Sequence, residues 1–227
     1  LCAEDELGLG KGHDGILVLD DSIPVGTTAA QYFELEDDYE IEIGLTPNRA
    51  DAMGHIGVAR DLVAYLNVHN NAGLNLNIPS VDEFKVANND LKIDVSVEAV
   101  DVCPRYTATT IKDVKVGPSP AWLQKRLRAI GLSPINNIVD VTNFVMHELG
   151  TPLHAFDAAK LNGKLVVKTA SKGEKFVTLD EVERKLADSN LMITNGKDHL
   201  CIAGVFGGID SGIKNSTTNV FLESAYF

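Results

Sequence analysis

The sequence has few of the residues that disulfide scaffolds, zinc sites and membrane proteins need. Its three cysteines, Cys2, Cys103 and Cys201, lie far apart and form no CxxC pair, so we expect free thiols and predict neither a disulfide framework nor a metal site. No run of 18 apolar residues occurs, and the first residues are acidic where a signal peptide is basic and then apolar. These absences predict a cytoplasmic protein with no membrane partner.

Basic residues are also scarce, with 20 Lys and Arg against 32 Asp and Glu, for a formal net charge of -12. A chain this acidic does not attract nucleic acid nonspecifically. Residues 1–102 contain 5 basic and 20 acidic residues, for a net charge of -15. Residues 103–227 contain 15 basic and 12 acidic residues, for a net charge of +3. The asymmetry indicates two units, or two solvated surfaces of different sign, and leaves room for a basic contact to a polyanion only in the second half.

What is present suits a folded protein, because 44% of the residues are hydrophobic. Residues 1–40 are rich in Gly, Asp and turn signals, and residues 41–100 read as a strand-helix unit with an Asn-rich linker at about 70–89. We place the main boundary near residue 100. The elements expected before it are a strand at 16–19, a strand at 39–44, a helix over 53–66 and a strand at 91–97.

Residues 101–227 read as an α+β unit that is mostly β at its end. Two helices are expected in succession, each opened by Ser-Pro (Ser119 and Ser133) and closed by glycine (Gly131 and Gly150). The chain stops within an apolar strand, so we expect a piece of a longer protein. The predicted strands lie at 106–111, 165–169, 176–179, 191–194, 200–206 and 220–227.

Glu223 is the candidate binding residue with the clearest physical signal. The two faces of its predicted strand are otherwise mostly apolar, so its carboxylate is expected to be partly buried and to need a hydrogen-bonding partner. Such an acid marks either a binding site or a structural pair with a cation or a backbone amide. The residue pattern alone leaves both interpretations open.

Four other residues are weaker candidates. His154 follows the glycine that closes a predicted helix, where it can position water or a carbonyl, although most lone histidines have no such role. Thr142 and Asn143 lie on that helix, and their ordinary interpretations are a hydroxyl bonded to the helix backbone and a solvated amide. Gly204 opens a glycine-rich run without GxGxxG or GK[ST] spacing, which allows either close approach to the backbone or a tight turn.

Several ordered motifs resemble the bacterial phenylalanyl-tRNA synthetase β subunit. They cover most of the chain, and Leu7-Gly8-Leu9-Gly10 looks like the exit from the OB-fold insertion of that subunit. The motifs are Leu45-Thr46-Pro47-Asn48-Arg49-Ala50-Asp51 with Gly57-Val58-Ala59-Arg60-Asp61, Asn136-Asn137-Ile138-Val139-Asp140-Val141-Thr142-Asn143, Gly150-Thr151-Pro152-Leu153-His154-Ala155-Phe156-Asp157, Ala203-Gly204-Val205-Phe206-Gly207-Gly208 and Leu222-Glu223-Ser224-Ala225.

The resemblance implies a domain plan. Residues 1–40 would be the tail of the OB-fold insertion, residues 41–100 a B1-like strand-helix unit with its linker, and residues 101–227 a mixed α/β B3/B4 editing domain rich in strands and truncated at its C-terminus. Such an editing domain hydrolyses tyrosine wrongly attached to tRNA(Phe). A second site of this kind is needed because a pocket made for phenylalanine rejects an added hydroxyl only weakly.

The resemblance also implies partners and residue roles. The parent complex is an α2β2 heterotetramer with the α subunit, and it attaches phenylalanine to tRNA(Phe) with ATP and magnesium; this segment needs no cofactor or metal. The alternative is a non-catalytic architectural module that contacts tRNA. By resemblance, Glu223 accepts a hydrogen bond from the tyrosine phenol, Gly204 and Ala203 line the ligand, and His154, Thr142 and Asn143 orient the ester and a hydrolytic water.

Overall fold

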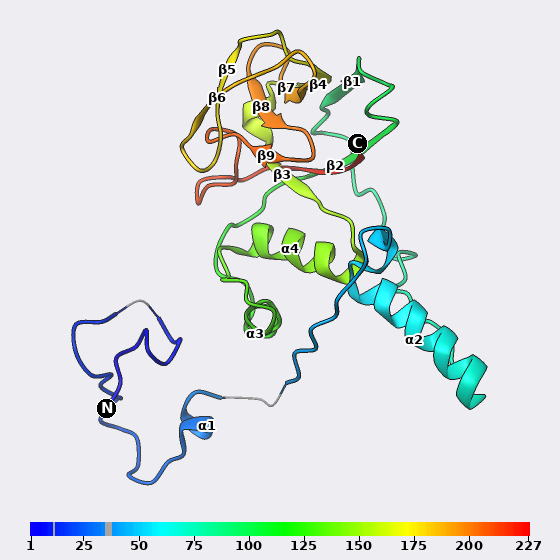
Figure 1. The fold of residues 1–227 in the computed structure, drawn as a ribbon. Coiled ribbons are helices and arrows are strands. Elements are labelled where there is room, and N and C mark those ends of the chain that lie inside the picture. Colours follow the sequence, from blue (N-terminus) through cyan, green and yellow to red (C-terminus); the bar gives the residue numbers. More distant parts are fainter. Residues whose placement is uncertain (11, 35–37) are drawn as a thin grey trace. The chain divides into compact units, whose positions relative to one another are not determined.

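The computed structural model describes residues 1–10, 12–34 and 38–227, and it divides the chain into two units, Leu1–Glu40 and Ile41–Phe227 (Figure 1). The first unit holds turns and the four-residue helix α1 (Ala29–Tyr32). The strands expected at 16–19 and 39–44 are wrong, because both segments are irregular. Alternating residues form a strand only where another strand supplies hydrogen-bonding partners.

The second unit begins with helical elements and continues mostly as strands, so the expected α+β fold class is confirmed. The sequence pattern missed β3 and β6, and it merged β8 with β9. The elements are η1 (Ala50–Ala52), α2 (His55–Asn70), β1 (Asp94–Val97), β2 (Arg105–Ile111), α3 (Ala121–Ala129), α4 (Asn137–Leu149), β3 (His154–Asp157), η2 (Ala158–Leu161), β4 (Lys164–Thr169), β5 (Lys175–Val177), β6 (Glu183–Lys185), β7 (Leu191–Thr194), β8 (His199–Ile202), β9 (Phe206–Gly207) and β10 (Val220–Tyr226).

The strands form three sheets, and two of them enclose the main core. One sheet has the order β1-β4-β7-β8-β9, a second has the order β2-β10-β3, and β5 pairs with β6. Strand β1 runs parallel to β4, so residues on both sides of position 100 share one sheet. Buried residues of the first two sheets form a single apolar cluster, which includes Leu165, Val167 and Ile193 from one sheet and Phe156 and Phe221 from the other.

Both Ser-Pro helix starts differ from the prediction. The first turn of α3 is preceded by Pro120 without a side-chain cap, and Ser119 instead donates its hydroxyl proton to Asp140 Oδ2 at 2.5 Å. The second helix begins at Asn137, later than its Ser-Pro signal, because the side chain of Asn136 accepts from the backbone N–H groups of Ile138 and Val139. An asparagine cap satisfies donors that proline cannot.

Asp140 joins the two helices from a fully buried position. Its second oxygen, Oδ1, accepts the backbone N–H of Ile135 at 2.8 Å, so both oxygens have partners. Helices α3 and α4 also meet through the edge-to-face contact of Trp122 with Phe144, whose ring centroids are 5.5 Å apart. The packing of α3 therefore depends on a buried carboxylate that needs each of its donors.

We predict that Ser119→Ala lowers the free energy of unfolding by about 1–3 kcal/mol, because it leaves Asp140 Oδ2 buried without its donor. The matched control is Ser133→Ala, which alters the other Ser-Pro signal at an exposed position. Urea denaturation of both variants provides the measurement. Equal effects of the two substitutions would contradict the structural role of Ser119.

Candidate functional site

Glu223 lies at the centre of the three-stranded sheet. It is on β10, the middle strand, opposite His154 of β3 and Ala108 of β2. Side chains at directly paired positions point to the same face of a sheet, so Glu223 and His154 are neighbours there. Glu223 is 5% exposed, which confirms its expected burial.

The partner of the Glu223 carboxyl is a phenol. Tyr106 of β2 donates its hydroxyl proton to Glu223 Oε2. Burial raises the pKa of Glu223 to about 7, and the hydrogen bond from Tyr106 opposes that rise. Burial and the nearby carboxylate also raise the pKa of the Tyr106 phenol well above its usual range, so Tyr106 remains a donor near neutral pH.

Tyr106 is the site residue that the sequence pattern missed. It pairs with Ala225, two positions along β10 from Glu223, so it is a diagonal cross-strand neighbour of the carboxyl. The strand over 106–111 was predicted, but periodicity does not reveal which strand lies beside it. The expected free thiols are confirmed, with Cys103 and Cys201 buried and Cys2 exposed.

His154 lies in a strand rather than in the expected loop. Residues 154–157 form β3, which pairs with β10 on the side opposite β2. Burial lowers the pKa of His154 to about 4, so the imidazole is neutral at pH 7. Its Nε2 is buried and has no hydrogen-bond partner among the described residues, and its ring meets Phe156 edge-on at 4.4 Å between centroids.

Gly204 occupies a tight turn between β8 and β9, and the glycine-rich run shows both a tight turn and close approach to the backbone. Its φ is +68°, a conformation that favours glycine. An aromatic ring lies against it, because a Cβ at Gly204 would be 3.2 Å from Cδ2 of Phe227. Ala203 before it is buried and donates its backbone N–H to Leu191 O at 2.9 Å.

The two candidate residues of α4 are not joined to this group. The Thr142 hydroxyl donates to Val139 O at 2.7 Å, the ordinary bond of a helical threonine to its own backbone. Asn143 is half-buried on the same helix. Among the described residues, neither side chain forms a hydrogen bond with Glu223 or His154.

A cavity of about 230 Å³ lies against the same three-stranded sheet but on its other face. Because side chains alternate along a strand, its threonine, leucine and serine side chains from β2 and β10 point away from the Glu223 carboxyl. The carboxyl faces the five-stranded sheet instead. The cavity is lined by Thr107, Ala108, Thr109, Leu153, Leu222, Glu223 and Ser224.

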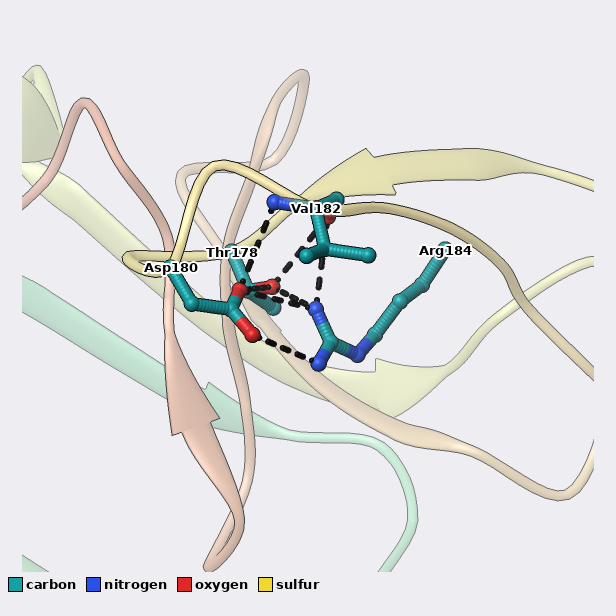
Figure 2. Close-up of polar contacts among 4 residues, drawn as sticks. All are labelled: Thr178, Asp180, Val182 and Arg184. Carbon is teal, nitrogen blue, oxygen red and sulfur yellow. Dashed lines mark hydrogen bonds and ion pairs between the residues drawn. The ribbon is translucent and has the colours of Figure 1, made fainter.

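An arginine clamp closes the turn between strands β5 and β6 (Figure 2). Arg184 donates to Asp180 at 2.8 and 2.9 Å and to the Thr178 hydroxyl, and its guanidinium lies 5.5 Å from the centre of the Phe206 ring. The Arg184 hydrogen bonds hold the pKa of Asp180 well below its usual range. Next to the clamp, Leu179 donates its backbone N–H to Gly207 O at 3.0 Å.

Gly207 and Gly208 allow this close packing. A Cβ at Gly207 would lie 2.9 Å from Cδ1 of Leu179 and 3.1 Å from Cε1 of His154. A Cβ at Gly208 would lie 2.7 Å from the backbone oxygen of Leu200. These glycines admit neighbouring side chains and backbone, so the glycine-rich run builds the wall beside His154.

Comparison with known protein families identifies the family of this chain. Residues 102–227 match the B3/4 domain, and the chain belongs to the B3/4 domain family. The described residues contain no helix long and apolar enough to cross a membrane, and no group of three or more His, Cys, Asp or Glu positioned to hold a metal ion.

The full chain is 57% identical to the phenylalanine–tRNA ligase β subunit of Bacteroides fragilis and 52% identical to that of Porphyromonas gingivalis. It spans 28% of the length of each relative. The structure can also be aligned with the crystal structure of an N-terminal fragment of the phenylalanyl-tRNA synthetase β subunit from Pyrococcus horikoshii. The alignment covers 79% of this chain and 53% of that fragment, with a TM-score of 0.46 and 18% identity. The sequence relatives confirm the resemblance that the motifs indicated.

We predict that Gly208→Ala lowers the free energy of unfolding by about 1–3 kcal/mol, because the new methyl group meets the fixed Leu200 carbonyl. Gly212→Ala is the matched control, since a Cβ there would lie 3.7 Å from Leu179, an ordinary contact. Thermal and urea unfolding of both variants gives the comparison. A Gly208→Ala variant as stable as the Gly212→Ala control would show that the turn moves away freely.

The raised pKa of Glu223 predicts a pH-dependent stability. Between pH 4.5 and about 7 the folded protein keeps a proton on Glu223 that the unfolded chain releases, so the contribution of Glu223 to the free energy of unfolding falls as the pH rises, by about 3 kcal/mol in total. The Glu223→Gln variant has no titrating group at this position, so its stability relative to wild type should increase from pH 4.5 to pH 8.

His154 titrates in the opposite sense. Its lowered pKa makes its contribution to stability fall as the pH drops from 6.5 to about 4. Both proteins keep His154, so its effect cancels in the difference between Glu223→Gln and wild type. Urea denaturation of each protein across this range supplies the measurement, and a difference that stays constant with pH would contradict the buried titration of Glu223.

Proposed function

We propose that this chain is the B3/4 segment of a phenylalanine–tRNA ligase β subunit and that it hydrolyses tyrosine wrongly attached to tRNA(Phe). The observation that carries the proposal is the buried Glu223 carboxyl, which accepts a hydrogen bond from a phenol within the chain itself. The same environment suits the phenol of a tyrosyl ligand.

Selectivity would come from the cost of leaving the second oxygen of Glu223 without a donor, since Tyr106 occupies only the first. A tyrosyl group supplies a donor to the second carboxylate oxygen, whereas a phenylalanyl group of nearly the same shape brings apolar carbon to a buried charge. A site built to hydrogen-bond a hydroxyl rejects the analogue that lacks it far more strongly than an apolar pocket rejects an added hydroxyl. Tyrosine is therefore the expected ligand.

His154 supplies a neutral imidazole beside Glu223. Its unpartnered Nε2 can hydrogen-bond the ester or a hydrolytic water, and we propose that it positions one of them. The turn at Gly204 and Ala203 would form the wall against the aromatic ring, and the Phe227 ring that lies against Gly204 supports this proposal. The roles of Thr142 and Asn143 in orienting the ester remain predictions; the Thr142 hydroxyl donates to Val139 O, and its oxygen can still accept a hydrogen bond.

The relatives are β subunits, and we propose that this segment works within a complete cytoplasmic ligase containing α subunits in an α2β2 arrangement. In that assembly, attachment of phenylalanine to tRNA(Phe) with ATP and magnesium would occur outside this segment. The editing step is a hydrolysis in which water attacks the ester carbonyl and the tRNA hydroxyl leaves. It needs no oxidant or phosphoryl donor.

We predict that Glu223→Gln in the complete ligase slows deacylation of Tyr-tRNA(Phe) by about 10- to 100-fold, because a charge-assisted hydrogen bond to the phenol is lost. Glu181→Gln, at an exposed acid on the turn before β6, is the matched control. The measurement is kcat/KM for Tyr-tRNA(Phe) and Phe-tRNA(Phe), with aminoacylation checked in parallel. Unchanged preference for tyrosine would reject Glu223 as the specificity residue and favour an architectural role for the segment.

A further inference from the structure

The phenol of Tyr106 is placed to control the carboxyl of Glu223. Tyr106 and Glu223 lie on adjacent strands and on the same face of the β2-β10-β3 sheet, one diagonal step apart. The phenol donates to Oε2. Ala108 is directly opposite Glu223 on β2, and its small side chain leaves the path between phenol and carboxyl open.

We propose that Tyr106 is the residue that positions Glu223 for specificity: its phenol holds one carboxylate oxygen and leaves the other to receive the phenol of the tyrosyl substrate. This inference rests on the proposed editing function and extends it to a residue with no role assigned by that function. Tyr106 acts through Glu223 and touches neither the ester nor the water.

The chemistry of the two groups supports this division. A phenol has one proton to donate, whereas a carboxylate has two oxygens that each accept. The terminal torsion of a glutamate is broad, so a fixed donor is needed to hold its plane in one orientation. A substrate phenol that meets a carboxylate already in place loses less affinity to reorganisation than one that must orient it.

The surroundings leave Glu223 as the group that changes charge near neutral pH. The titratable groups facing it are Tyr106 from β2, Cys103 from the segment before β2, Cys201 from β8 and His154 from β3. Burial raises the pKa of both thiols and keeps them protonated, and it keeps His154 unprotonated. The hydrogen bond from Tyr106 favours the ionised form of Glu223 against this apolar setting.

The test is Tyr106→Phe in the complete ligase, with Tyr65→Phe on the exposed face of α2 as the matched control. We expect the kcat/KM preference for Tyr-tRNA(Phe) over Phe-tRNA(Phe) to fall roughly tenfold at pH 7. We also expect the pH at which half of the maximal preference is reached to move upward, because the carboxyl loses the donor that favours its ionised form. Both enzymes are assayed from about pH 5.5 to 9, the range around the titration of Glu223.

A second variant keeps both the ring and the hydroxyl in place if Tyr106→Phe fails to fold. A fluorinated tyrosine at position 106 is a stronger hydrogen-bond donor of nearly the same shape, so it should move the pH midpoint downward. Opposite shifts from the two substitutions would mark control of the carboxyl, which a purely structural contact would not produce.

The outcomes separate this inference from the proposed function. If Glu223→Gln loses the tyrosine preference while both Tyr106 variants keep the wild-type preference and pH midpoint, the role of Tyr106 is overturned and the editing proposal stands. A Tyr106→Phe enzyme that prefers tyrosine more strongly would also overturn it, since the phenol would then compete with substrate. If Glu223→Gln keeps the preference, the proposed function itself fails.

Discussion

The withdrawal of the Glu223 carboxyl from water is the constraint on which the rest of this site depends. The residue stands on the middle strand of a sheet whose inner face packs against a second sheet, so solvent cannot stabilise its charge. The groups around it are a phenol that stays protonated and donates a hydrogen bond, a neutral imidazole and protonated thiols. Together they make a carboxyl that ionises near neutral pH and depends on the donors that reach it.

The architecture that creates this environment relies on close backbone approach. A Cβ at Gly208 would collide with the Leu200 carbonyl, and one at Gly207 would press on the side chains of Leu179 and His154. The clamp of Arg184 with Asp180 fixes the β5–β6 turn. The backbone bond from Leu179 to Gly207 then holds this turn against that surface. The glycine-rich run is therefore a packed wall beside His154, and the measurable cavity lies on the opposite face of the sheet.

Particular elements show where sequence reasoning succeeds. Strands β4, β7 and β10 follow from the sequence pattern, since burial of a strand is reflected in its residue types, and helix α2 follows from the helical spacing of its apolar residues. The helices after Ser119 and Ser133 were also foreseen, but their first residues were not. Ser119 does not cap its helix because its hydroxyl hydrogen-bonds to the buried Asp140, a residue distant in sequence. The second helix begins later than expected because Asn136 caps it in place of the preceding Ser-Pro.

The sequence by itself determined that Glu223 would be a buried acid, that the thiols would be free and that the second half would be rich in strands, because these properties depend on each residue's neighbours along the chain. Only the tertiary structure decided that Tyr106 and His154 meet Glu223 and that Thr142 does not bond to it. Those contacts arise from the pairing of β10 with two strands distant in sequence, β2 and β3. Periodicity records which residues avoid water, whereas strand pairing fixes which of them touch.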